Sequence, residues 1–99
     1  MRIIKKLADK IKDELEDAKE YAEDYVEHKV AGDISAANRY REMANDELKH
    51  AGYLHEMAVA QIKSIEKTFT PTVEMEEKWT LAHKKYVEEV ASIRKILDM

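Results

Sequence analysis

The chain has 99 residues, the size of one small domain with a single hydrophobic core. Apolar residues make up 44% and charged residues 38%, a balance typical of a soluble helical protein and not of a disordered one. The net charge of -4 argues against a nucleic-acid-binding surface, and the absence of cysteine excludes disulfides and thiolate metal ligands.

The N-terminal segment gives no sign of a targeting signal. It begins with basic residues, but acidic residues follow before an apolar region could form, so it does not resemble a signal peptide. No apolar run approaches the length of about 18 residues that a membrane span needs. We therefore expect one cytoplasmic domain covering residues 1–99, with no membrane or nucleic-acid partner.

Two short breaks divide the chain into three predicted helices. Ala31-Gly32-Asp33 offers a C-cap glycine followed by an N-cap aspartate. The segment 68–72 offers a threonine cap with Pro71 at the first helical position. With only two glycines and one proline, an all-β fold is excluded. The sequence predicts an all-α fold of three long antiparallel helices at about 3–30, 34–68 and 72–97.

Each predicted helix carries one stripe of residues at alternating steps of three and four, as expected for a face that packs against its neighbours. The predicted stripes are Ile4, Leu7, Ile11, Glu14, Ala18, Tyr21 and Tyr25; then Ala37, Tyr40, Ala44, Glu47, Ala51, Leu54, Ala58, Gln61 and Ile65; then Glu76, Trp79, His83, Tyr86, Val90, Ile93 and Leu97. The remaining positions are rich in charged residues and form a solvated surface.

Three ionisable residues lie on or beside these stripes and are candidate metal ligands. Glu14 and Glu47 occupy stripe positions on the first two helices, and His50 follows Glu47 by one helical turn. A carboxylate removed from water needs a compensating partner, and two facing carboxylates need a proton or a cation between them. A glutamate and a histidine three residues apart point the same way and can bind one ion.

A Glu-x-x-His pair alone is a weak signal in a chain so rich in glutamate. The prediction therefore depends on the combination of this pair with a second stripe glutamate one helix earlier. The alternative is that the stripe is open to solvent and that these side chains pair with lysine, arginine or tyrosine.

Two strings of residues carry a resemblance to a known family. Glu14 is followed by Tyr21 seven positions later, Glu47-Leu48-Lys49-His50-Ala51 supplies Glu-x-x-His-Ala, and the two glutamates are 33 positions apart. Over residues 7–60 this pattern resembles rubrerythrin and the wider ferritin-like superfamily, and in particular small three-helix ferritin-like proteins of bacteria and their phages. The resemblance implies a di-metal carboxylate centre, with iron as the expected metal and manganese or zinc as alternatives.

The chain departs from this family because it has only one of the two halves of such a centre. A full ferritin-like bundle has four helices, and Thr80 stands where a second Glu-x-x-His, ending at His83, would need glutamate. The resemblance therefore implies a dimer or larger homo-oligomer that completes the bundle, as in encapsulated ferritins. In that arrangement Glu14 and His50 are terminal ligands, Glu47 bridges, and Tyr21 or Asp17 gives outer support.

Asp17, His83 and His55 are weaker candidates for metal binding. For His83, which lies near Trp79 and Tyr86, we predict a core position with a hydroxyl or carboxylate partner. Metal binding by His83 is the less favoured alternative. His55 lies on the opposite flank of its helix from His50, where it covers the core or contacts a partner. His28 lies in the last turns of the first helix, where a cation is favoured by the helix dipole.

The sequence is compatible with two functions. The first is a ferritin-like metal protein whose iron reacts with O₂ or peroxide, in ferroxidase or peroxide-scavenging chemistry. The second is a non-enzymatic helical interaction protein, of the phage-encoded kind, that keeps the ferritin-like scaffold with a degenerate site. A plain coiled-coil module fits less well, because it would keep leucine or isoleucine at the positions of Glu14, Glu47 and His83.

Overall fold

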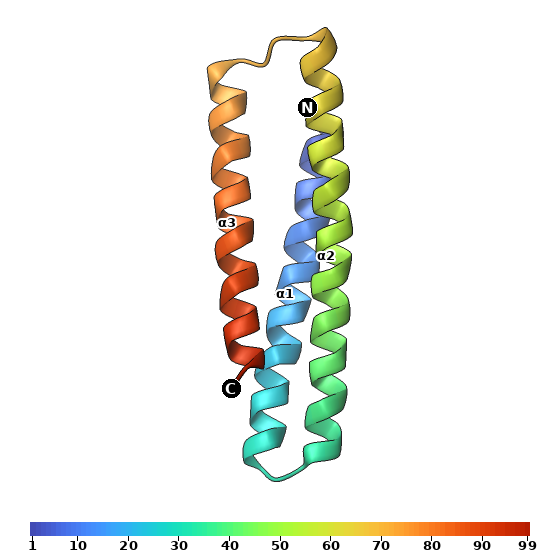
Figure 1. Cartoon of the computed structure of the whole chain (residues 1–99), viewed down its shortest axis with the longest axis vertical. Coiled ribbons are helices and arrows are strands. Elements are labelled where there is room, and N and C mark those ends of the chain that lie inside the picture. The colour runs from blue at the N-terminus through green and yellow to red at the C-terminus, as the bar shows by residue number, and fades with distance from the viewer.

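The computed structural model describes all 99 residues and contains three α-helices and no strands. The helices are α1 (Arg2–Val30), α2 (Ile34–Thr68) and α3 (Val73–Leu97), so the predicted all-α fold is confirmed and the predicted boundaries hold within one residue. α2 runs antiparallel to both α1 and α3 (Figure 1). Together the helices form an elongated bundle of 55 × 17 × 16 Å.

The first connection forms as its sequence predicts. Gly32 has a positive φ of 86°, a conformation that glycine adopts without steric cost. The amides of Gly32 and Asp33 donate to the last carbonyls of α1, on Lys29 and His28. The Asp33 carboxylate then accepts a 3.1 Å hydrogen bond from the amide of Ala36 and caps α2.

The second connection differs by one residue from the prediction. Thr72 is the N-cap of α3, and its hydroxyl accepts a 3.1 Å hydrogen bond from the amide of Met75. Pro71 therefore precedes the cap, and the prediction that it occupies the first helical position was wrong. The physical reason is that the threonine after the proline offers the capping oxygen at the required spacing.

α1 and α2 pack closely along their length. Four alanines on the two helices have no exposed surface, which allows the backbones to approach closely: Ala18, Ala22, Ala44 and Ala51. Leu15, Leu48 and Tyr25 complete this part of the core. No polar or charged side chain is fully buried.

The buried positions correct the predicted stripes. Leu15, Ala22 and Leu48 are buried, although each lies one residue beyond a predicted stripe position. The buried face of α1 and α2 is therefore broader than a strict heptad pattern, because an α-helix turns every 3.6 residues while the heptad stripe assumes 3.5. As a consequence Glu14, Tyr21 and Glu47 lie at the half-buried edge of the core.

α3 is attached mainly through its C-terminal half. Its only buried residues are Ile93 and Leu97, and its N-terminal half lies further from the other two helices (Figure 1). Trp79 and Tyr86 are half-buried and His83 is exposed, so the predicted burial of the α3 stripe was wrong for this half. No helix combines the length and the apolar character that crossing a membrane requires.

Candidate metal centre

The structure brings Glu14, Glu47 and His50 together on one side of the α1–α2 pair. Each contributes one potential ligand atom, and the three atoms lie within 4.8 Å of one another. The Nδ1 atom of His50 is 3.8 Å from a Glu14 carboxylate oxygen and 3.7 Å from a Glu47 carboxylate oxygen. These separations are too long for hydrogen bonds, so the imidazole is not locked onto either carboxylate.

Helix geometry places these residues. Glu47 and His50 are one turn apart on α2 and therefore project in the same direction. Glu14 is near the middle of α1, where the buried alanines hold α1 close to α2. The cluster thus combines a local pair on one helix with a carboxylate from the other, on the best-packed part of the bundle.

The cluster lies at the edge of the core and faces solvent. The exposed fractions of the side chains are 29% for Glu14, 20% for Glu47 and 53% for His50. Burial alone therefore does not require a partner for the carboxylates, which corrects the expectation that they lie within the core stripe. What distinguishes the site is the convergence of two carboxylates and an imidazole on one open point.

The donor set fits a metal ion after a small adjustment. Metal–ligand distances of about 2.1 Å place adjacent ligand atoms about 3.0–3.4 Å apart. The observed separations of 3.7 and 3.8 Å exceed this by a few tenths of an ångström. All three side chains are partly exposed and would have to adjust to bring their ligand atoms, now within 4.8 Å of one another, to these distances. A cation would also offset the repulsion between the two carboxylates.

The weaker sequence candidates lie outside this cluster. Asp17 is exposed and is not among the converging residues, and Tyr21 packs 6.3 Å from the ring of Tyr40, centroid to centroid. His28 is half-buried, and its Nδ1 lies 2.8 Å from the backbone carbonyl oxygen of Asp24, which satisfies it within its own helix. This local hydrogen bond gives His28 a structural role at the end of α1.

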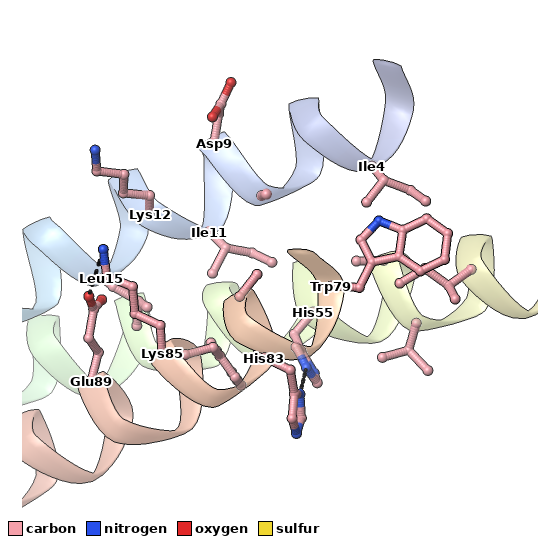
Figure 2. A pocket seen from close by; sticks show the side chains of 16 residues that line it. Ile4, Asp9, Ile11, Lys12, Leu15, His55, Trp79, His83, Lys85 and Glu89 are labelled. Carbon is pink, nitrogen blue, oxygen red and sulfur yellow. Dashed lines mark hydrogen bonds and ion pairs between the residues drawn. The ribbon is translucent and has the colours of Figure 1, made fainter. Parts of the chain in front are cut away.

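His55 and His83 form a pair of their own between α2 and α3. The Nε2 atom of His55 lies 3.0 Å from the Nδ1 atom of His83, so one imidazole donates a hydrogen bond to the other (Figure 2). The predicted core position of His83, with a hydroxyl or carboxylate partner, was wrong. Sequence reasoning weighed the two histidines separately, because no local pattern records how α3 is positioned against α2.

Desolvation lowers the pKa of His55 below its ordinary value, and the nearby His83 lowers it further, while Glu56 acts in the opposite direction. The Tyr86 ring stacks on the His55 ring with centroids 4.3 Å apart and an angle of 7° between the planes. His55 is therefore a fixed and predominantly neutral imidazole near neutral pH.

Comparison of the chain with protein-family models, with curated proteins and with solved structures finds no match.

Proposed function

We propose that this chain binds a divalent metal ion, with iron as the expected one, through Glu14, Glu47 and His50. The observation that carries the proposal is the convergence of these three side chains, from two helices, within 4.8 Å. Two carboxylates and one imidazole form a hard-to-borderline ligand set, which suits Fe(II), Mn(II) or Zn(II). The half-exposed edge position leaves the ion accessible from solvent.

We further propose that two copies complete a ferritin-like di-metal centre. His50 is five residues from His55, or about 140° around the helix, and His55 faces α3. The cluster therefore lies on the face of the α1–α2 pair that α3 leaves free. An isologous dimer through that face would contribute four glutamates and two histidines to a four-helix bundle.

The accessible surface of the chain is larger than that of a compact monomer of the same mass. The accessible surface is 7173 Å², whereas a compact monomer of 11.5 kDa exposes about 5,800 Å². The difference exceeds the roughly 800 Å² per partner that a standard protein interface buries. Met57 and Tyr53, exposed on α2 beyond His50, would supply apolar contacts to such an interface.

In this arrangement the residues have distinct tasks. In each copy Glu14 and His50 would be the terminal ligands of one ion, and Glu47 would be the ligand shared between the copies. Bound iron would supply oxidation chemistry with O₂ or peroxide, which is ferroxidase or peroxide-scavenging activity. The α1–α2 core would hold the ligands in position, because side chains on tightly packed helices are placed more accurately than those on loops.

An anaerobic Fe(II) titration of the purified chain tests the proposal, with mass in solution measured at each step. We expect saturable binding that Glu47→Ala and His50→Ala each weaken at least tenfold. Glu20→Ala on α1 and His28→Ala are matched controls that remove an acid or a histidine away from the cluster, and they should bind as the parent does. Aerobic addition of Fe(II) then measures oxidation.

Two outcomes would overturn parts of the proposal. If Glu47→Ala and His50→Ala bind iron as tightly as the parent chain, the metal site is rejected and the non-enzymatic interaction protein becomes the better interpretation. If the parent binds one ion per chain at this site and remains monomeric, the dimeric di-metal centre is rejected while the metal site stands.

A further inference from the structure

The facing imidazoles of His55 and His83 lie at the edge of an open cavity of about 290 Å³ between the three helices. Figure 2 shows the two side chains pointing toward each other, one from α2 and one from α3, with Trp79 further along the cavity. His55 lies on a different face of α2 from His50. The proposed function above does not involve His55 or His83.

We propose that His55 and His83 form a second metal site, for a late first-row divalent ion such as Zn²⁺ or Cu²⁺, that fastens α3 to α2. The two nitrogen atoms are 3.0 Å apart. Two imidazoles bound to one ion at about 2.0–2.1 Å place their nitrogens about 3.0–3.4 Å apart. The imidazole that donates the hydrogen bond would first transfer its proton, through solvent, to its other ring nitrogen. Both facing nitrogens could then bind the ion with little movement of either helix.

The surroundings prepare this pair for an ion. A histidine binds metal through a neutral nitrogen, and desolvation already keeps the pKa of His55 below its ordinary value. The stacked Tyr86 ring fixes the plane of His55, so little side-chain freedom is lost on binding. His83 is exposed, which gives the ion a path from solvent.

The ligand chemistry separates this site from the first one. No carboxylate joins the two imidazoles in a three-ligand group, whereas the first site has two carboxylates for one imidazole. Imidazole pairs favour zinc, copper and nickel, and carboxylates favour harder ions. We therefore expect Zn²⁺ or Cu²⁺ to fill the His55–His83 site in conditions under which Mn²⁺ does not.

The consequence of binding concerns α3. Its buried residues, Ile93 and Leu97, lie near its C-terminal end, so its N-terminal half has few buried contacts. An ion held by His55 and His83 would join this half to α2 and narrow the cavity beside Trp79. Binding should therefore stabilise the fold and slow amide hydrogen exchange in the first half of α3.

The test uses the full chain without a histidine tag, in a Glu47→Gln/His50→Gln background that removes the first site. Zn²⁺ is titrated by calorimetry, and imidazole nitrogen resonances are followed by NMR. We expect one ion per chain, with the signals of His55 and His83 shifting together. At Zn²⁺ a hundredfold above Kd, the melting temperature should rise by roughly 10 °C.

Adding His83→Gln to this background should weaken Zn²⁺ binding at least tenfold and abolish the rise in melting temperature. Adding His28→Gln instead is the matched control, which should change neither the affinity for Zn²⁺ nor the rise in melting temperature. Without Zn²⁺ the two variants should melt within a few degrees of each other, because His83 is exposed. The proposal is overturned if His83→Gln binds Zn²⁺ as tightly as its parent, or if Zn²⁺ binds only by joining His83 residues of two chains.

Discussion

The α1–α2 pair and the N-terminal half of α3 are built from similar amounts of charge but pack very differently. Ala18, Ala22, Ala44 and Ala51 are completely buried between α1 and α2, whereas α3 buries nothing before Ile93. The stripe of α3 instead carries Trp79, His83 and Tyr86. Small side chains let two helices approach closely, and large rings hold them apart.

Because of this difference, the two candidate metal sites lie on parts of the bundle that are packed differently. Glu14, Glu47 and His50 lie on the tightly packed pair, so the core fixes the backbone from which these side chains project. His55 and His83 instead connect the tight pair to the loosely packed helix. An ion at the first site would bind between two helices that already pack tightly. An ion at the second site would strengthen the weakly packed contact between α2 and α3.

The largest expected effect is the difference between Leu15→Ala and Leu81→Ala. Leu15 is 4% exposed in the α1–α2 core, and Leu81 is 68% exposed on α3. The first change should lower the free energy of unfolding by about 2–5 kcal/mol through lost burial and a cavity, and the second by at most about 0.5 kcal/mol. Urea unfolding measures the free energy of unfolding of the two variants. Equal decreases in this free energy would contradict the loose packing of α3.

An intermediate effect is expected for Gly52→Ala, on the face of α2 that meets α3. A methyl group built there would lie 4.0 Å from the Tyr86 hydroxyl oxygen, an ordinary contact. Removing a glycine from a helix interior should raise the free energy of unfolding by about 0.5–1 kcal/mol. A lowered melting temperature would instead indicate that Tyr86 packs more closely on α2 than the structure shows.

The smallest expected effect is a pH dependence at His55, measured with metal chelated. Its pKa is lowered in the folded chain, mainly by desolvation, so the unfolded chain binds the proton more readily. The stability that this group contributes is therefore complete above the unfolded pKa of about 6.5 and decreases as the pH falls below it. Urea unfolding between pH 8 and pH 5 should show that the free energy of unfolding falls more steeply with decreasing pH for the parent than for His55→Gln. If the free energies of the two proteins change in parallel, the lowered pKa of His55 is rejected.

Much of the fold follows from local sequence features. The two connections are specified by Gly32 with Asp33 and by Thr72 near Pro71, and the helix boundaries follow from them. The three converging ligands were also predictable, because Glu47 and His50 are one turn apart and Glu14 has the matching position on the preceding helix. Helix periodicity and short-range hydrogen bonds carry this information.

The sequence alone therefore determined the three helices, their order and the candidate ligands Glu14, Glu47 and His50. Only the tertiary structure decided that these ligands lie at the edge of the core, because whether Glu47 or its neighbour Leu48 faces inward depends on how closely α1 and α2 pack. The pairing of His55 with His83 was also decided there, since the position of α3 depends on side-chain volumes that no local pattern records.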